Sequence, residues 1–160
     1  MNATDIDVLR AFYVGNRRQL FTYALSITGN REAAEDAIQG VFEKLLRRSG
    51  LPSDLRPYVF RSVRNAALDR WRRARTRADS IFAAGERADP DPSAPARPDD
   101  LGPLLEQLSR DEREAIVLKI YGGLTFQEIA DLRRVPLSTA STWYARGLEQ
   151  LKVLLNAEIR

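Results

Sequence analysis

The chain has 160 residues, 44% hydrophobic and 29% charged, a composition typical of a globular protein with one domain or two small ones. It contains no cysteine and no histidine, which excludes disulfides, thiolate chemistry, imidazole catalysis and most transition-metal sites. We therefore expect no catalytic residue, metal ion or other cofactor. The N-terminus does not resemble a signal peptide, and no run approaches the roughly 18 apolar residues of a membrane span, so we expect a cytoplasmic protein without a membrane segment.

The formal net charge is only +3, but it is unevenly distributed. Residues 1–78 carry net +7, residues 79–103 carry net −4, and residues 104–160 are neutral. Of the 25 basic residues, 22 are arginine, whose planar guanidinium suits phosphate and guanine, although a GC-rich genome would explain this usage equally well. The asymmetry rather than the total points to a polyanionic partner for the first segment.

In the first segment, apolar residues recur every three or four positions, which predicts helices. A first helix over about 5–28 ends at Gly29, a favoured helix terminator, and Asn30 can cap the second helix. Pro57 suits the first turn of a third helix over about 56–77. No segment alternates with a period of two, so we predict an all-α fold.

Residues 79–103 are rich in proline and acidic residues and hold few large apolar side chains. Such a segment gains little from ordering, so we expect a flexible tether. The chain then divides into two small helical domains, residues 1–78 and 104–160, each near the lower size limit for independent folding.

The C-terminal segment has the spacing of a helix-turn-helix. Gly122 and Gly123 end one helix, Thr125 and Glu128 form a capping box for the next over about 125–134, and Ser138 or Thr139 caps a last helix. The residues expected to be buried are Leu105, Leu108, Ile116, Val117, Ile120, Ile129, Ala130, Leu132, Ala140, Tyr144, Gly147, Leu148 and Leu151. A helical hairpin used only for protein contacts is the alternative, because the last helix has few basic residues.

The third predicted helix holds eight arginines and one acidic residue, Asp69. Four arginines fall within about 80° of arc on a helical projection: Arg61, Arg64, Arg72 and Arg75. The apolar residues lie on another arc: Val59, Phe60, Val63, Ala66 and Ala67. Trp71 stands between the two arcs, where it could stack on an unpaired base. The alternative is a solvated charged face with Trp71 in the core.

Taken in order, three motifs resemble the extracytoplasmic-function sigma factors, the small two-domain group of bacterial RNA polymerase sigma subunits. Residues 34–42 contain the Glu-Asp-x-x-Gln-x-x-Phe pattern of the family's core-binding segment. Residues 58–73 contain the Arg-Asn-x-x-x-Asp pattern and trailing arginines of the promoter-melting helix, and residues 108–130 resemble the C-terminal helix-turn-helix domain. The resemblance covers nearly the full length, and three motifs in this order are highly specific.

The resemblance implies partners and site residues. Core RNA polymerase would be contacted by Asp36, Gln39 and Phe42. The promoter minus-ten element would be contacted by Arg61, Arg64, Asn65, Trp71, Arg72 and Arg73. The minus-thirty-five element would be read by Ser138, Thr139, Ser141, Thr142 and Arg146. The loop at about 48–55 would capture a flipped base, and the acidic tether would run through the polymerase channel. An anti-sigma factor is a further expected partner, and the free chain would be a monomer.

Several positions depart from the family's pattern. Arg134 stands where the turn usually has glycine, so a positive φ there would cost about 1 kcal/mol. Arg133 stands where leucine is common, so we expect it to snorkel or turn outward. In the last helix Ala140, Ser141 and Trp143 replace the usual valine, lysine and arginine, which leaves fewer phosphate anchors.

These observations favour a promoter-specificity subunit without catalytic activity of its own. A sigma mimic that sequesters an anti-sigma factor is one alternative, favoured by the weak recognition helix and disfavoured by the arginines and Trp71. A dimeric helix-turn-helix regulator on palindromic sites is another. An enzyme is least favoured, because the adjacent carboxylates of Glu35 and Asp36 diverge by about 100° on a helix.

Overall fold

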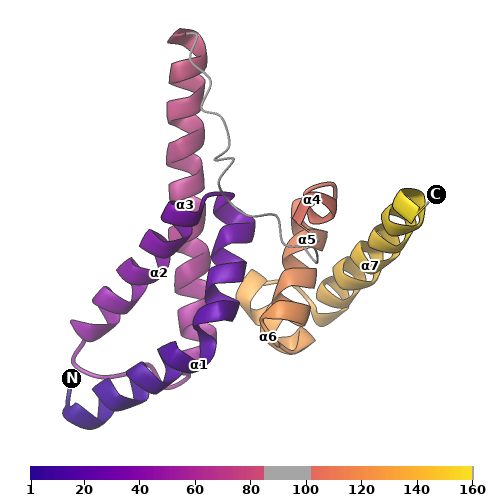
Figure 1. Ribbon diagram of the computed structural model, residues 1–160. Helices are drawn as coiled ribbons and strands as arrows, with labels where there is room; N and C mark the ends of the chain where they lie inside the picture. The colour runs from indigo at the N-terminus through magenta and orange to yellow at the C-terminus, as the bar shows by residue number, and fades with distance from the viewer. Residues whose placement is uncertain (85–101, 160) are drawn as a thin grey trace.

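The computed structural model describes residues 1–84 and 102–159, with side chains described to residue 77 and from residue 102. The described residues form helices joined by short connections and contain no strand, so the predicted all-α fold is confirmed (Figure 1). The first half contains α1 (Ala3–Thr28), α2 (Arg31–Leu46) and α3 (Leu55–Ala84). The second half contains α4 (Gly102–Leu105), α5 (Arg110–Ile116), the π-helix η1 (Val117–Tyr121), α6 (Phe126–Arg133) and α7 (Leu137–Ile159).

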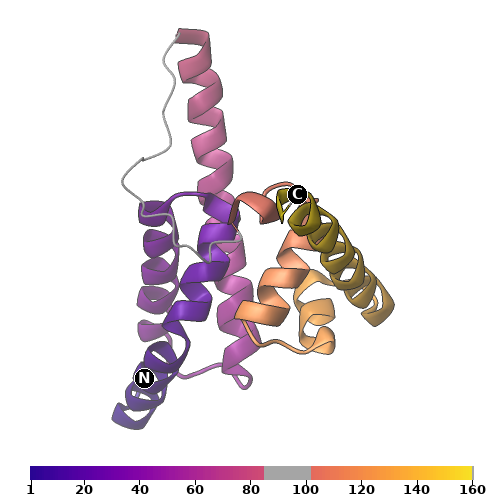
Figure 2. The same ribbon diagram turned by 45° about the vertical axis from the view of Figure 1, so that its right-hand side comes forward.

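Helices α1, α2 and α3 pack on one another, and α3 extends well beyond the other two (Figures 1 and 2). The helix ends follow the local sequence. Gly29 ends α1 in the left-handed conformation at φ 67°, as predicted, and the side chain of Asn30 accepts a hydrogen bond from the amide of Ala33 at 2.9 Å. The core beneath α3 holds Tyr23 and Phe60, both fully buried.

In the second half the predicted capping box is present. The hydroxyl of Thr125 accepts a hydrogen bond from the Glu128 amide at 3.1 Å, and the Glu128 carboxylate accepts one from the Thr125 amide at 3.0 Å. Helix α6 ends at Arg134, the only described residue other than glycine with a positive φ, at 55°. The conformation expected for a glycine is therefore retained by an arginine.

Three expectations about the second half are wrong. Ser138 and Thr139 do not cap α7, because the helix already begins at Leu137 and the Thr139 amide donates to the carbonyl of Pro136 at 3.0 Å. Ile120 is 53% exposed, since the π-helix η1 turns it away from the core. Leu148 is 38% exposed and lies beside the buried stripe of α7 rather than in it.

The two halves contact each other: α1 lies against η1, and α3 lies against α6 (Figure 2). Their buried residues form one continuous hydrophobic cluster. The predicted tether, residues 79–103, lies mostly outside the described residues; at its ends α3 continues to Ala84 and α4 begins at Gly102. None of the described helices is long and apolar enough to cross a membrane.

Candidate nucleic-acid interface

Helix α3 carries the predicted nucleic-acid face. Its apolar arc is buried as expected, with Ala66 partly buried and the others buried: Val59, Phe60, Val63 and Ala67. The predicted arginine arc, in contrast, divides into two environments. Arg61 and Arg64 face the second half, whereas Arg72 and Arg75 are exposed on the part of α3 that projects past α1 and α2, as is Arg73 outside the predicted arc.

The contact at Arg64 is a buried ionic cluster centred on Glu114 of α5. The Glu114 side chain is 6% exposed and accepts hydrogen bonds from Arg64 Nε at 2.6 Å and from Arg133 Nη1 at 2.8 Å. The hydroxyl of Tyr23 donates a third, at 2.5 Å. Arg133 also donates from Nη2 to Asp111 at 2.6 Å, so two guanidinium groups face two carboxylates. One buried carboxylate thus joins α1, α3, α5 and α6.

The cluster changes the ionisation of two of its members. Burial raises the pKa of Tyr23 well above its ordinary value, and the negative charge of Glu114 raises it further. Burial lowers the pKa of Arg64, but the hydrogen bond to Glu114 and its charge outweigh that effect, so the pKa is raised overall. Tyr23 is therefore neutral and Arg64 charged under ordinary conditions.

This cluster also corrects the expectation for Arg133. The side chain is only 13% exposed and turns inward between Asp111 and Glu114, instead of snorkelling outward. Its guanidinium lies 4.7 Å from the ring centre of Trp143 on α7. The sequence offers one sign of this cluster that we did not use: Glu114 directly precedes the apolar run 115–118, where a charge requires a partner.

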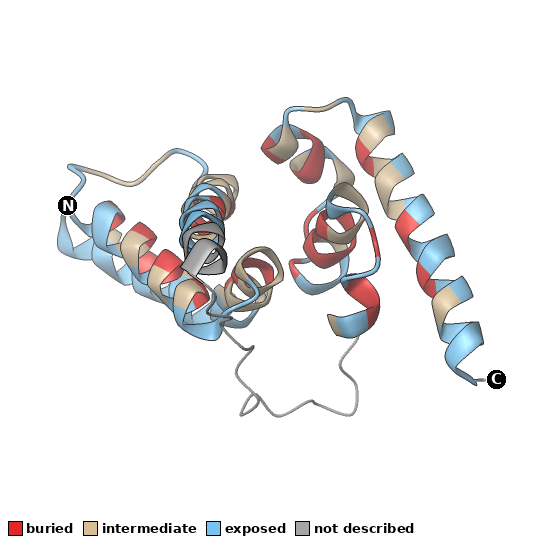
Figure 3. Cartoon of the chain, turned by 90° about the horizontal axis from the view of Figure 1, so that it is seen from above, coloured by how far each residue is buried: buried red, intermediate tan, exposed pale blue. Residues whose placement is uncertain are grey.

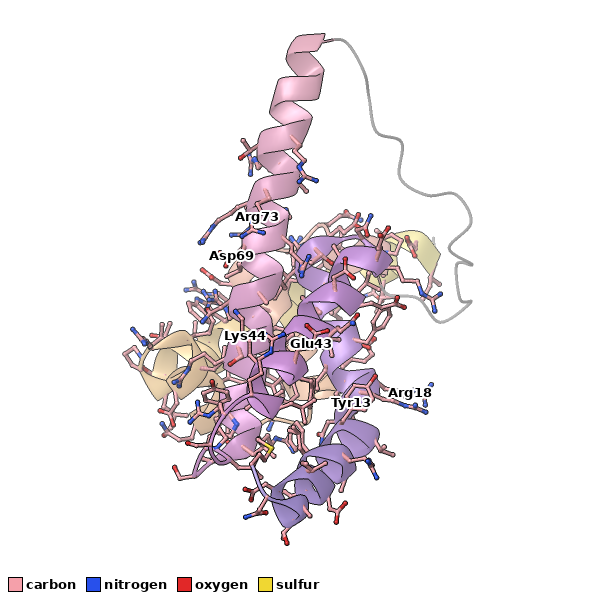
Figure 4. The ribbon with its side chains drawn as sticks, turned by 90° about the vertical axis from the view of Figure 1, so that its left-hand side faces the viewer. Tyr13, Arg18, Glu43, Lys44, Asp69 and Arg73 are labelled. Carbon is pink, nitrogen blue, oxygen red and sulfur yellow. The ribbon has the colours of Figure 1, made fainter. Side chains whose placement is uncertain are left out.

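Trp71 is partly buried at the junction of the two halves. Its ring lies 5.1 Å from the guanidinium of Arg75 and 4.2 Å from that of Arg110 on α5. Of the other predicted minus-ten residues, Asn65, Arg72 and Arg73 are exposed. Figure 4 looks onto the face of the first half that lies away from the second half and shows Arg73 on the free part of α3.

A cavity of about 440 Å³ lies beside the start of α3, at the loop predicted to capture a base. Most of its lining comes from the first half: Pro52, Ser53, Asp54, Pro57, Tyr58 and Arg61. Asp131 of α6 lines the remaining side. Arg48 donates to the Tyr58 hydroxyl at 3.1 Å and lies 5.1 Å from the centre of its ring, which holds one wall in place.

The predicted polymerase-contacting residues share the outer face of α2. Asp36 lies 3.8 Å from Arg70 of α3, and Gln39 donates to Glu43 at 3.1 Å. Phe42 is partly buried and packs edge-on against Tyr13, with ring centres 5.0 Å apart. Tyr13, an exposed aromatic side chain on α1, belongs to no motif that marks it in the sequence; Figure 4 labels Tyr13 and Glu43 on this face.

The predicted recognition residues lie on the first turns of α7, which packs against α4, α5 and α6 on the side away from the first half (Figure 3). Three of them are exposed: Ser138, Thr142 and Arg146. Thr139 and Ser141 are partly buried, and the Ser141 hydroxyl donates to the carbonyl of Ser138 at 3.2 Å. No group of acidic side chains in the described residues could hold a metal ion.

Comparisons with known proteins agree on one family. The family model described as Sigma-70 region 2 matches residues 12–77, and the one described as Sigma-70, region 4 matches residues 100–151. The RNA polymerase sigma factor CarQ of Myxococcus xanthus is 34% identical over 137 residues, covering 79% of this chain and 76% of that protein. The ECF RNA polymerase sigma factor SigL of Mycobacterium tuberculosis is 31% identical over 141 residues, covering 80% and 77%.

A solved structure with a similar fold is the sigma factor RpoE of Bartonella quintana, which was crystallised in complex with the anti-sigma factor NepR. It superposes with a TM-score of 0.69 at 22% sequence identity, covering 92% of this chain and 96% of that chain. The likeness therefore extends over both halves.

Proposed function

Because this chain belongs to the extracytoplasmic-function sigma factors, which act in transcription initiation, we propose that it docks on core RNA polymerase through α2 and opens promoter DNA with α3. The arginines of α3 carry this proposal. Arg72 and Arg73 stand exposed beside the partly buried Trp71, so positive charge and an aromatic ring lie together where α3 leaves the packed part of the first half. This combination suits the backbone and bases of a separated strand.

Polymerase binding is assigned to the face formed by Asp36, Gln39 and Phe42, with Tyr13 beside them. Its mixture of an aromatic pair and exposed polar groups is typical of a protein–protein contact. Minus-thirty-five recognition is assigned to the start of α7, where Ser138, Thr142 and Arg146 are exposed. Hydroxyl and guanidinium groups there can reach base edges in the major groove.

The remaining parts of the proposal follow from this role. Residues 1–78 and 104–160 form the two functional domains, and residues 79–103 form the tether between them. The polymerase does the chemistry, so the chain itself is not an enzyme. The proposed site of action is the cytoplasm, where transcription takes place in bacteria. An anti-sigma factor is a proposed partner, supported by the relative that was crystallised with one.

Promoter opening is tested by run-off transcription with core polymerase on genomic fragments, followed by permanganate mapping of unpaired bases. Arg72→Ala/Arg73→Ala should lose opening while polymerase binding is unchanged. The matched control is Arg17→Ala/Arg18→Ala. These two consecutive arginines are exposed on α1, so the double substitution removes the same charge outside α3. Equal opening by both variants at saturating polymerase would show that the arginines of α3 are merely solvated.

Polymerase binding is tested with a charge reversal at the α2 face. Asp36→Arg should weaken binding, because it reverses a charge on the proposed contact face. The fold should be retained, since the half-exposed pair of Asp36 with Arg70, at 3.8 Å, contributes little to folding. Glu149→Arg is the control: it makes the same kind of charge reversal at an exposed position of α7, outside the α2 face. Unchanged affinity in the Asp36 variant would refute this assignment.

Two measurements separate the alternatives. A sigma mimic would bind an anti-sigma factor but not core polymerase, which a pull-down with both proteins resolves. A helix-turn-helix regulator of the ordinary kind would be a dimer, whereas the proposed function predicts a monomer by mass measurement in solution.

A further inference from the structure

Trp143 of α7 is a large aromatic side chain to which the proposed function gives no role. On a helical projection it stands about 40° from Thr139 and about 60° from Arg146, two of the residues proposed to read the minus-thirty-five element. The buried stripe of α7 passes on its other side, through Ala140 and Gly147, which accounts for the partial burial of Trp143. Trp143 therefore stands between the core and the row of side chains that we propose to contact duplex DNA.

The ring of Trp143 is held in place from the side of α6. The Arg133 guanidinium lies 4.7 Å from the ring centre, and it is itself bound to Asp111 at 2.6 Å and to Glu114 at 2.8 Å. Because only 13% of its side chain is exposed, Arg133 has little freedom to leave the ring or to reach a phosphate. An indole held in this way offers a base a fixed edge, which is what selective contact requires.

The indole N–H of Trp143 is available to a ligand. Within residues 1–77 and 102–159 it donates no hydrogen bond. It is not buried either, because the buried side-chain nitrogens without a partner in these ranges belong to Arg56, Arg61 and Arg113. The N–H is a donor and never an acceptor, so Trp143 presents one donor beside an apolar ring edge.

A donor beside an apolar edge matches one base in the major groove. Thymine presents the O4 acceptor next to its C5-methyl group, whereas cytosine presents an amino donor and has no methyl group. Guanine presents two acceptors, and adenine presents an acceptor and a donor, again without a methyl group. Among the four bases, only thymine therefore offers both an acceptor for the indole N–H and an apolar group for the ring edge.

We infer that Trp143 is a specificity-determining residue that reads a thymine of the minus-thirty-five element, with the indole N–H donating to O4 and the ring edge packing on the C5-methyl group. This inference rests on the proposed function of α7 and adds the base that the helix selects. Ser138, Thr142 and Arg146 then supply polar contacts to the duplex, and Trp143 supplies the apolar one. Because the methyl contact is apolar, its contribution is nearly independent of salt, unlike that of a phosphate contact.

The inference is tested by removing the methyl group alone. Start sites are first mapped by run-off transcription with core polymerase, which defines the upstream element that the promoters share. Each thymine of that element is then replaced by uracil, and binding of the full-length chain with core polymerase is measured by competition between the duplexes. At one position uracil should weaken binding about fourfold, the factor expected for the loss of one buried methyl group. The factor should be the same at about 50 and 200 mM salt.

Variants of α7 then identify the residue that reads the methyl group. Trp143→Ala should bind the thymine and uracil duplexes equally, whereas Trp143→Phe, which keeps an aromatic edge and loses the N–H, should retain a preference for thymine at lower overall affinity. The matched control is Leu137→Ala, which removes another exposed apolar side chain from α7, about 120° around the helix from Trp143. It should keep the fourfold factor. Because each variant is compared with itself on two duplexes, a loss of stability does not imitate the result.

Direct contact is tested with 5-iodouracil at the sensitive position, because its iodine replaces the methyl group and crosslinks to aromatic side chains on irradiation. The crosslink should map to Trp143 within the tryptic peptide 135–146 and be absent from Trp143→Leu. A crosslink to another residue, a thymine preference that persists in Trp143→Ala, or an upstream element in which no thymine is sensitive to uracil would overturn the inference. Failure of the chain with core polymerase to protect any upstream element would instead refute the proposed function of α7.

Discussion

Arg133 offers a direct test of how the buried cluster is stabilised. Arg133→Leu would remove the hydrogen bonds to Glu114 at 2.8 Å and to Asp111 at 2.6 Å. Orphaning a buried charge typically costs about 3–5 kcal/mol. Here Glu114 retains Arg64, and the 45% exposed Asp111 can be rehydrated, so we expect a smaller loss of about 2–3 kcal/mol in the free energy of unfolding.

The loss is measured by urea unfolding at neutral pH. The transition is followed by circular dichroism at 222 nm, where α-helices have a strong negative ellipticity. Arg31→Leu is the control, because Arg31 and Glu35 form an i,i+4 pair that is 76% and 57% exposed and contributes under about 0.5 kcal/mol. Glu114→Leu combined with Arg133→Leu should cost less than the sum of the single changes by about 1 kcal/mol or more. A loss below about 0.5 kcal/mol for Arg133→Leu, or strict additivity, would refute this account.

Three further outcomes are expected. Arg134→Gly should raise the free energy of unfolding by up to about 1 kcal/mol, because the left-handed φ of 55° suits glycine; an equal loss would contradict this. Gly147→Ala should lower it by about 1 kcal/mol or more in the same assay, since the new Cβ would lie 2.5 Å from Cδ1 of buried Ile116. The raised pKa of Tyr23 gives a stability contribution that is fully present below about pH 10 and is lost as the pH rises further. The free energy of unfolding should therefore fall less between about pH 10 and higher pH in Tyr23→Phe than in the unchanged protein.

Local features of the fold were predictable because neighbouring residues determine them. The ends of α1, α2 and α6 depend on Gly29, Asn30 and the Thr125–Glu128 pair, which act within one helical turn. The start of α7 was misjudged because two hydroxyl residues matched a capping pattern, while the helix began earlier at Leu137. Propensity identifies candidates for a cap but does not choose among them.

The buried cluster could not be predicted, because its members are far apart in the chain. Tyr23 is 91 residues from Glu114, and Arg64 is 50 residues from it. A helical projection places Arg64 on the same arc as Arg72, and nothing local distinguishes an arginine that meets solvent from one that meets a buried carboxylate. The environments of the predicted site residues therefore depend on how the two halves pack.

Two departures of this chain from the family's pattern are in contact with each other in the structure. Arg133, where leucine is usual, and Trp143, where arginine is usual, lie 4.7 Å apart as a cation–π pair. The two changes together place a guanidinium on α6, where it binds Glu114, instead of on α7, the helix that we propose to contact DNA. The residue that would anchor a phosphate upstream instead stabilises the carboxylate that holds Arg64. One exchange thus removes a proposed phosphate anchor from α7 and adds a second guanidinium to the buried carboxylate that joins α5 to α3.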